Sequence, residues 1–508
     1  MRIINGVLGL IWATATLFFR DKPSAMKSAL LAAVLTLASS VFALDGQIGI
    51  HDPSTVILCD GKYYTYGTGG TPLVSDDGWA WRPGTRAARG GMAPDVIHIG
   101  DRYFMFVSAN VGGQPRANIN MISSKTLDPN SPDYRWVEGG VVASSDGVED
   151  CNAIDPGAFL DPTDGRLWLT YGSYFGYTRI VELDPKTGKR LNPGDQPVNL
   201  AINCEASDMI CHDGWYYLLA THGSCCRGSD SGYNIRVGRA KSVFGPFLDQ
   251  TGVSMIEGGG KLLIGSGGRF IGPGHFGLID LGDGVQKFSM HWEADFDRGG
   301  ASVLDIRPLL WKDGWPVAGE NLKPGTFEIE SVRTGTALEM AVEGVPVGGG
   351  RGGRGMGGGL GGGGMFGGRG GVVPDQDVAQ VSTNWPAGNV DVRMANYQCQ
   401  AQQKWTISAV ANAAGYPGSP YFKIAIAGTD RALAVSEVEE LVTLPAFTGG
   451  PEQLWRIDQL ADGTWRIMSK SVSATRQPLT LSAVGTSFAA LAKFNPESDR
   501  QRWLIKAP

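Results

Sequence analysis

The sequence predicts an all-β protein, in which a five-bladed β-propeller is followed by a second β domain. Three observations lead to this prediction. Glycine supplies 74 of the 508 residues, and so high a share disfavours long helices. A hairpin pattern recurs five times between residues 51 and 318, and a different pattern that closes with Gln-x-Trp recurs three times between residues 327 and 503.

The composition limits the kinds of partner that the protein can have. The 44 Lys and Arg residues are outnumbered by 50 Asp and Glu residues, which gives a net charge of -6. A dense basic block, the usual footprint of a nucleic-acid binder, is missing outside the glycine-rich segment. Seven cysteines are too few for a disulfide scaffold. We expect a monomer that binds an uncharged or basic partner and no nucleic acid.

Residues 1–43 are expected to be a targeting region. From Met26 to Ala43, a short basic start, an apolar core and small residues form the pattern of a secretory signal peptide. The apolar run within residues 1–25 is interpreted as an over-long gene start, and a membrane anchor is the alternative. The mature protein is therefore expected to be secreted or periplasmic, without a membrane span.

Residues 45–318 are expected to form the propeller. Each copy of the pattern starts with an acidic residue or His, continues to an Asp-Gly or Gly-Asp turn, and ends in an alternating aromatic strand. The starting residues are Asp52, Asp95, Asp155, Glu205 and His275. Four-stranded units repeated around an axis form a propeller, and the start of each innermost strand then lies beside the axis. A β-sandwich, the alternative, does not explain these starting residues.

Three of the starting residues carry the carboxyl groups that hydrolysis of a glycosidic bond needs. One ionised carboxylate activates water, one protonated carboxyl donates to the leaving oxygen, and a third tunes the other two. Asp52, Asp155 and Glu205 can supply this set if they converge at the axis. An isolated Asp-Pro is weak support, because Asp-Pro commonly begins a turn.

The motifs around these residues occur in a characteristic order: His51-Asp52-Pro-Ser, Met92-Ala-Pro-Asp95, Asn152-Ala-Ile-Asp155-Pro, Glu205-Ala, and Gly272-Pro-Gly-His275. Gly223-Ser-Cys-Cys-Arg-Gly228 and the stretches at 126–136 and 268–275 add to them. Over residues 48–318 the set resembles glycoside hydrolase family 43, and in particular its arabinanase branch.

The resemblance implies a secreted, inverting hydrolase of α-1,5-linked L-arabinan, with an endo mode expected. It implies that Asp52 is the general base and Glu205 the general acid. Asp155 would orient Glu205 and raise its pKa. Inversion predicts that the carboxyl groups of Asp52 and Glu205 lie about 6.5–9.5 Å apart.

The resemblance also assigns a metal, and further polar residues are candidate contacts to the sugar. His275 would face a structural ion on the propeller axis, often Ca²⁺ with mostly water ligands, and no organic cofactor is expected. The alternative is that His275, a lone histidine in a turn, has only a packing role. Candidate polar contacts to the substrate are His51, Asn152, Ser173, Ser224 and Arg227. For His51 the alternative is that it only turns the strand, and for the other four it is that they support other site residues.

Two positions depart from the arabinanase pattern. Met92 and Cys151 stand where the family commonly has Trp, which puts the expected sugar-stacking surfaces and the exact sugar specificity in doubt. A disulfide between Cys151 and Cys204 is a hypothesis based on their places before Asn152 and Glu205. The state of the adjacent Cys225 and Cys226 is left open.

Residues 322–508 are expected to form the second β domain. Its closing motifs are Gln403-Lys-Trp405, Gln453-Leu-Trp455 and Gln501-Arg-Trp503, and their spacing resembles the ricin-type β-trefoil. In residues 348–371, 17 of the 24 positions are glycine. Such a segment cannot bury enough apolar surface to offset its ordering entropy, so a disordered loop is expected.

Two other functions are alternatives to the arabinanase interpretation. An exo-acting α-L-arabinofuranosidase or β-xylosidase could use the same propeller. A non-catalytic, lectin-like polysaccharide-binding protein is the alternative outside enzymes, and the three carboxyl groups argue against it.

Overall fold

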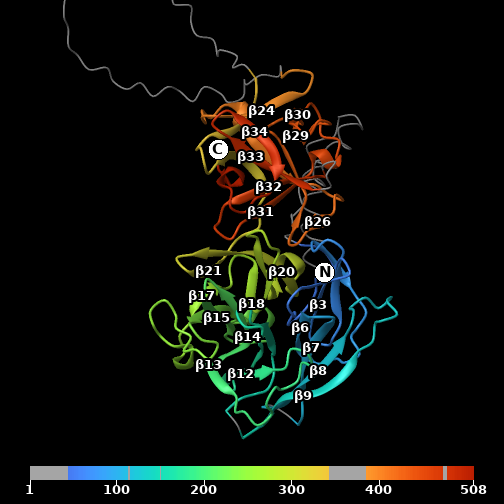
Figure 1. The fold of residues 1–508 in the computed structure, drawn as a ribbon, viewed down its shortest axis with the longest axis vertical. Helices are drawn as coiled ribbons and strands as arrows, with labels where there is room; N and C mark the ends of the chain where they lie inside the picture. The colour runs from blue at the N-terminus through green and yellow to red at the C-terminus, as the bar shows by residue number, and fades with distance from the viewer. Residues whose placement is uncertain (1–43, 113–114, 149, 343–384, 473–476) are drawn as a thin grey trace, which may run out of the picture. The chain divides into compact units, whose positions relative to one another are not determined.

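The computed structural model describes residues 44–112, 115–148, 150–342, 385–472 and 477–508, which form β-strands and a few short 3-10 helices (Figure 1). Among these residues, no helix has the length and apolar character needed to cross a membrane. The all-β prediction is confirmed. The expected signal region, residues 1–43, and the glycine-rich segment, residues 348–371, lie outside the described residues.

Five sheets follow one another along the chain and form the blades of the propeller. Blade 1 contains β1 (Asp45–Gly46), β2 (Ile57–Cys59), β3 (Lys62–Tyr66), β4 (Pro72–Ser75) and β5 (Ala80–Pro83). Blade 2 contains β6 (Met92–Ile99), β7 (Arg102–Asn110), β8 (Arg116–Ser124) and β9 (Val137–Asp146). Blade 3 contains β10 (Gly157–Leu160), β11 (Leu167–Tyr171), β12 (Tyr177–Leu183) and β13 (Val198–Ile202).

Blade 4 contains β14 (Cys204–His212), β15 (Trp215–His222), β16 (Asn234–Ala240) and β17 (Lys261–Ile264). Blade 5 contains β18 (Phe270–Asp280), β19 (Gln286–Asp295), β20 (Ala301–Lys312) and β21 (Trp315–Ala318). The predicted five-bladed propeller is therefore confirmed, and the degenerate fifth copy of the hairpin pattern forms a full blade.

Asp-Gly turns explain why the repeated sequence folds into hairpins. Asp60 and Gly61, between β2 and β3, have φ values of 50° and 77°. Asp213 and Gly214, between β14 and β15, have φ values of 49° and 68°. Two successive residues with positive φ form the type I′ turn, whose twist matches that of antiparallel strands. The predicted turns thus join the first two strands of blades 1 and 4.

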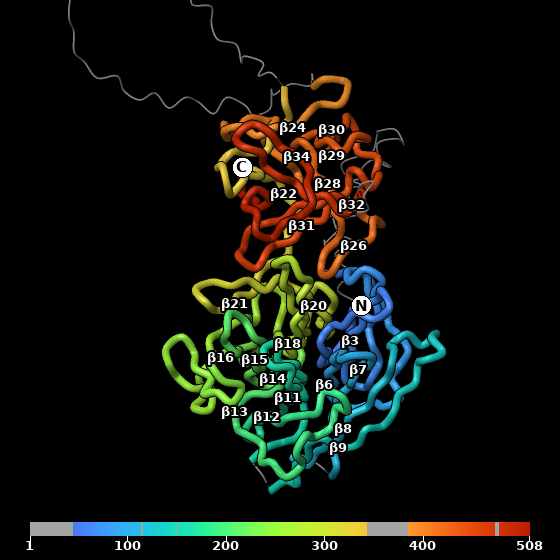
Figure 2. Tube along the Cα trace, viewed as in Figure 1, coloured from blue at the N-terminus to red at the C-terminus, as the bar shows by residue number. Residues whose placement is uncertain are grey.

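Blade 1 closes the ring by pairing with the last blade. Strand β1 runs parallel to β5, and just after it the backbone oxygen of Ile48 accepts a hydrogen bond from Leu304 of β20 at 2.9 Å. In Figure 2 this N-terminal segment, drawn in blue, lies beside β20. Closure of this kind holds the first and fifth blades together, and the radial arrangement leaves only short, protected sheet edges.

Hydrophobic clusters fill the spaces between neighbouring blades, and they place two cysteines apart. Cys151 belongs to a cluster between blades 2 and 3, whereas Cys204 belongs to a cluster between blades 3 and 4. Both cysteines are buried, and no disulfide joins them. The hypothesis of a Cys151–Cys204 disulfide is therefore wrong, because the two thiols face different sides of blade 3.

The second domain is a β region that starts at Gly325. Its strands are β22 (Gly325–Ser331), β23 (Ala337–Met340), β24 (Val390–Ala395), β25 (Trp405–Ala409), β26 (Gly415–Tyr416), β27 (Ser419–Pro420), β28 (Phe422–Ile426), β29 (Ala432–Val435), β30 (Leu441–Leu444), β31 (Trp455–Gln459), β32 (Trp465–Val472), β33 (Pro478–Val484), β34 (Phe488–Lys493) and β35 (Trp503–Lys506). All except the β26–β27 pair join one sheet system.

The three Gln-x-Trp motifs occupy equivalent places in this domain. Gln403, Gln453 and Gln501 each accept a hydrogen bond from a backbone N–H and donate one to a backbone oxygen. The indole N–H groups of the three following tryptophans each donate to a leucine carbonyl, at 2.8–3.1 Å. Each copy of the Gln-x-Trp motif therefore makes the same contacts in the core of the domain.

Candidate active site

One residue near the start of each blade has a left-handed backbone. Their φ values are 52° for Asp52, 43° for Ala93, 55° for Asp155, 47° for Ala206 and 58° for His275. Residues other than glycine rarely adopt positive φ, and strained backbone of this kind is often found at functional sites. The fivefold recurrence shows that each blade turns its chain in the same way where the innermost strand begins.

In blades 2, 4 and 5 this residue lies within a β-bulge. The pairing of the first and second strands shifts between Met92 and Asp95, between Glu205 and Asp208, and between Gly274 and Gly277. A bulge bends its strand and re-aims a side chain that regular alternation would point elsewhere. The bulge of β14 begins at Glu205, and the bulge of β18 contains His275.

Asp52 is buried and surrounded by polar groups. Its Oδ2 accepts a hydrogen bond from the Thr68 hydroxyl at 2.6 Å and lies 2.8 Å from His51 Nδ1. Burial would raise the pKa of Asp52, but the neighbouring His275, His51 and His291 outweigh it and hold that pKa well below its usual range. Asp52 is therefore ionised, which is the form that a general base needs.

Asp155 is a second buried carboxyl of the same cluster, and its protonation preference is the opposite. Burial is the main cause that raises its pKa well above the usual range, and the charges of Glu205 and Asp52 add to it. Its backbone N–H donates to the Ser108 hydroxyl at 3.0 Å, which ties the start of blade 3 to blade 2.

Glu205 has a pKa raised to about 7. Burial is the largest cause, a hydrogen bond from the Tyr233 hydroxyl opposes it, and the charges of Asp52 and Glu293 raise the pKa further. Only 4% of Glu205 is exposed. A carboxyl that keeps its proton near neutral pH suits a general acid.

His51 joins the base to a fourth carboxylate. Its Nδ1 lies 2.8 Å from Asp52 Oδ2, and its Nε2 lies 3.2 Å from Glu293 Oε1. Burial would lower the pKa of His51, but hydrogen bonds with these two carboxylates raise it to about 10. The imidazole is therefore cationic and held between two anions.

Blade 5 supplies two site residues that the sequence interpretation missed. His291 Nδ1 accepts a hydrogen bond from the Asp52 backbone N–H at 2.9 Å, and Glu293 contacts His51. Both lie on β19, and their separation by two residues puts them on one face of the strand. The sequence signal that could have identified them is the His-x-Glu pattern in the second strand of this blade. Tyr233, the residue that precedes β16, had no such signal.

His275 lies beside the base without a complete set of partners. Its Nδ1 is 3.3 Å from Asp52 Oδ1, but neither ring nitrogen makes a hydrogen bond within the described part of the chain. Burial is the main cause that lowers the pKa of His275, and the charge of Asp52 opposes it. Its backbone N–H donates to the Thr221 hydroxyl of blade 4 at 3.2 Å.

The four other residues expected to contact the sugar differ in how deeply they are buried. Asn152 and Ser173 are fully buried, and Asn152 Nδ2 donates to the Ser173 hydroxyl at 3.3 Å. Ser224 is half-buried and Arg227 is exposed, both in the loop after β15. The structure thus places Asn152 and Ser173 beneath the surface of the site, with Ser224 and Arg227 nearer to solvent.

The arrangement provides one ionised and two proton-retaining carboxyl groups within a single buried cluster. The ionised Asp52 can take a proton from water, and Glu205 can donate one to a leaving oxygen. This division of roles between neighbouring carboxyls is the requirement for hydrolysis of a glycosidic bond.

Comparison with known proteins finds enzymes of this chemistry. Residues 63–316 match the family described as glycosyl hydrolases family 43. The extracellular exo-alpha-(1->5)-L-arabinofuranosidase of Cellvibrio japonicus is 31% identical over 322 residues, covering 57% of this chain and 92% of that protein. The extracellular endo-alpha-(1->5)-L-arabinanase 1 of Bacillus subtilis is 30% identical over 292 residues, covering 53% of this chain and 87% of that protein.

Two solved structures share the propeller. The exo-1,5-alpha-L-arabinanase from a bovine ruminal metagenomic library is 32% identical, with a TM-score of 0.50, and the match covers 54% of this chain and 98% of that one. The alpha-L-arabinanase of Cellvibrio cellulosa, solved in complex with arabinohexaose, is 30% identical, with a TM-score of 0.50, and the match covers 54% of this chain and 96% of that one.

Proposed function

Because the chain belongs to glycosyl hydrolases family 43 and is a glycoside hydrolase, we propose that it cleaves α-1,5-linked L-arabinan outside the cell. The observation that carries this proposal is the opposite protonation preference of Asp52 and Glu205 in one buried cluster. The names of the relatives from Cellvibrio japonicus and Bacillus subtilis support both the substrate and the extracellular location. The protein would act as a monomer.

The reaction would proceed with inversion. Asp52 takes a proton from a water molecule while the water oxygen attacks the anomeric carbon. Glu205 gives its proton to the departing sugar oxygen as the glycosidic bond breaks. Asp155, whose pKa is raised in part by the charge of Glu205, would hold Glu205 in place. His51 and Thr68 would keep the carboxylate of Asp52 oriented toward the water.

We propose endo cleavage, and exo cleavage is the alternative that one of the relatives carries in its name. Product analysis on linear arabinan separates the two. A mixture of oligomers early in the reaction supports endo cleavage, whereas a single small product supports the exo alternative. Absence of any product from arabinan, with turnover of a xylan or galactan, would overturn the proposed substrate.

Glu205→Gln tests the proposed acid. Loss of a general acid typically costs a factor of about 10²–10⁴ in turnover, whereas binding of arabinan should persist because the side chain keeps its shape. The matched control is Glu257→Gln, an exposed glutamate of the same blade, which should leave turnover unchanged. If wild type binds arabinan and never cleaves it, the lectin-like alternative replaces the enzyme proposal.

A structural ion near His275 is part of the proposal. The two buried ring nitrogens of His275 make no hydrogen bond to the described residues, which fits a group that completes their surroundings. A single imidazole is a poor match to the all-oxygen shell that Ca²⁺ prefers, so water molecules would have to supply most of the ligands. Such an ion would act on structure and on the charge beside Asp52.

We also propose that residues 322–508 form a β-trefoil. The threefold repetition of the contacts made by Gln403, Gln453 and Gln501 supports it, as do the equivalent indole hydrogen bonds of the tryptophans that follow. Three equivalent lobes around one core would produce this repetition.

A further inference from the structure

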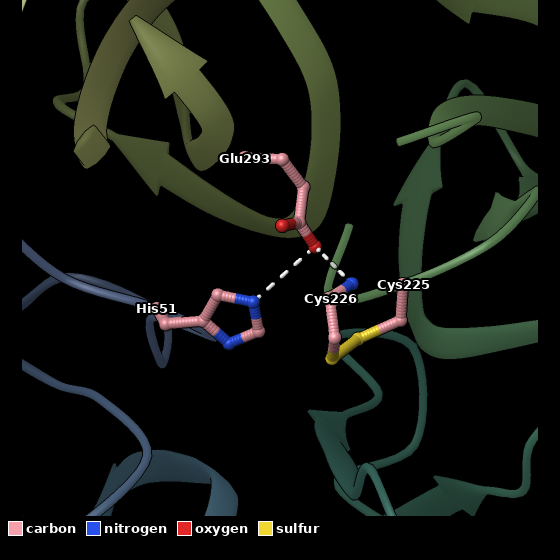
Figure 3. A group of neighbouring side chains, drawn as sticks. All are labelled: His51, Cys225, Cys226 and Glu293. Carbon is pink, nitrogen blue, oxygen red and sulfur yellow. Dashed lines mark hydrogen bonds and ion pairs between the residues drawn. A yellow bond between two sulfur atoms is a disulfide. The ribbon is translucent and has the colours of Figure 1, made fainter. Parts of the chain in front are cut away.

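A disulfide between neighbouring cysteines lies beside the catalytic cluster. Cys225 and Cys226 are bonded in the loop between β15 and the 3-10 helix η1 (Gly228–Asp230). Cys225 is half-buried and Cys226 is exposed, so a small reagent can reach the bond. The backbone N–H of Cys226 donates to Glu293 Oε1 at 2.9 Å, and the same oxygen lies 3.2 Å from His51 Nε2 (Figure 3).

These contacts bring together four groups that bind soft divalent metals. One ligand atom from each of His51, Cys225, Cys226 and Glu293 lies within 4.8 Å of the others. Thiolate, imidazole and carboxylate are the ligands of zinc, which prefers four of them in a tetrahedron. Zinc bonds of about 2.0–2.3 Å put neighbouring ligand atoms roughly 3.3–3.8 Å apart. The His51–Glu293 contact of 3.2 Å is already close to that spacing.

We propose that reduction of the Cys225–Cys226 disulfide opens a zinc site formed by the two cysteine thiolates, His51 and Glu293. While the disulfide is intact, its sulfurs are not thiolates and the ligand set is incomplete. A phosphine breaks the S–S bond, takes the oxygen of a water molecule, and leaves that water's two protons on the two sulfurs. Zinc then displaces the two thiol protons and the proton on His51 Nε2.

Zinc at this site would involve the proposed base. His51 Nδ1 lies 2.8 Å from Asp52 Oδ2, so a metal on Nε2 would make Asp52 the carboxylate partner of a metal-bound histidine. The Asp52 carboxylate would then accept a hydrogen bond from the Nδ1–H of the metal-bound imidazole, and its position would be set by the metal site. The reduced, zinc-bound enzyme is therefore inactive, whereas the disulfide keeps the oxidised enzyme free of this inhibition. This consequence for activity rests on the proposed function.

A second set of residues offers a competing explanation for any zinc that binds. His51, Asp52 and His291 also place one ligand atom each within 4.8 Å of the others. This set contains no cysteine, so it would bind zinc equally well in the oxidised and reduced proteins. The dependence on reduction separates the two sites.

The experiment compares full-length oxidised protein with protein reduced by a phosphine and freed of reductant under anaerobic conditions. Zinc binding is measured by titration calorimetry, and Co²⁺ is used as a spectroscopic probe because thiolate ligands give a sulfur-to-metal charge-transfer band. The matched control is the Cys225→Ser, Cys226→Ser double variant, which keeps the other five thiols. Glu293→Gln provides a second variant that keeps both cysteines.

The reduced wild type should bind one zinc per chain more than the reduced double variant, with the cobalt charge-transfer band present only in the former. Glu293→Gln should weaken zinc binding by about 10-fold or more. Turnover of the reduced wild type should fall in proportion to the zinc bound and return with a chelator. Equal zinc binding by oxidised and reduced protein, or by wild type and double variant, would overturn the proposal. The cobalt band does not depend on turnover. Absence of the band therefore contradicts the zinc site alone, whereas absence of arabinan cleavage contradicts the proposed function.

Discussion

Tyr233 affects the pH range in which Glu205, the proposed general acid, keeps its proton. Its hydroxyl donates a hydrogen bond to Glu205 Oε1, which favours the ionised carboxylate and so lowers the pKa of Glu205. A general acid works only while protonated, so activity should fall as the pH rises through about 7, the pKa of Glu205. Tyr233→Phe removes the opposing hydrogen bond. The fall in kcat/KM should then move to higher pH by about one pH unit.

Tyr217→Phe is the matched control for this prediction. Tyr217 belongs to blade 4, as Tyr233 does, but its hydroxyl donates to the backbone oxygen of Gly314 and not to Glu205. Its removal should leave the pH profile in place even if it lowers stability. A profile of Tyr233→Phe that is unchanged, or that moves to lower pH, would show that another group controls the alkaline side.

At the scale of elements, the hydrogen bonds of Gln403 tie two segments of the second domain together. Gln403 Oε1 accepts from the Gln398 backbone N–H at 2.8 Å, and Nε2 donates to the Asn396 carbonyl and to Glu339 Oε2, each at 2.8 Å. Gln403→Ala leaves the buried Glu339 and the backbone groups of Gln398 and Asn396 without these hydrogen bonds. Since each such loss costs about 1–3 kcal/mol, the free energy of unfolding of this domain should fall by about 2–4 kcal/mol.

The neighbouring Gln402 gives a control for that prediction. It is half-buried and one residue away, so Gln402→Ala changes the same kind of side chain at nearly the same place. Denaturant unfolding followed by tryptophan fluorescence should show a small effect, under about 0.5 kcal/mol, for Gln402→Ala. Equal destabilisation by the two variants would mean that the repeated glutamine contact adds little to the domain.

The blades could be predicted from the sequence because hairpins leave a local pattern. Asp-Gly turns and alternating strands depend on residues close in sequence, so repetition alone located five units and the four acidic residues and one histidine that start them. The left-handed starts at Ala93 and Ala206 could not be found in this way, because alanine gives no sign of positive φ. Tertiary packing imposes the positive φ at these alanines, and the only local hint in the sequence is the motif in which each alanine lies.

Contacts between blades were also outside the reach of a local pattern. His291 and Glu293 reach Asp52 and His51 across the closure of the ring, from residues more than two hundred positions away. The wrong pairing of Cys151 with Cys204 has the same origin. Proximity to the axis did not reveal that the two thiols belong to clusters on opposite sides of blade 3. Residues next to a catalytic motif can therefore face away from one another.

At the scale of the whole molecule, residues from blades that are distant in sequence contact one another at the propeller axis. His275 of blade 5 lies 3.3 Å from Asp52 of blade 1, and its backbone N–H donates to Thr221 of blade 4. A group bound to His275 would thus contact surroundings that exist only when the ring is closed. Any ligand that binds the folded state and not the unfolded chain raises the melting temperature.

The proposed ion at His275 predicts a joint loss of stability and turnover when it is removed. Chelation of the oxidised wild type should lower both the melting temperature, measured by calorimetry, and the rate on linear arabinan, and added Ca²⁺ should restore both. His275→Ala should be less stable at the start and should no longer respond to the chelator. His212→Ala, which removes a half-buried histidine stacked on Trp311 at 3.6 Å between ring centroids, should respond to the chelator as wild type does. If chelation changes neither quantity in wild type, His275 acts through packing and through its position beside Asp52, and the ring closes without an ion.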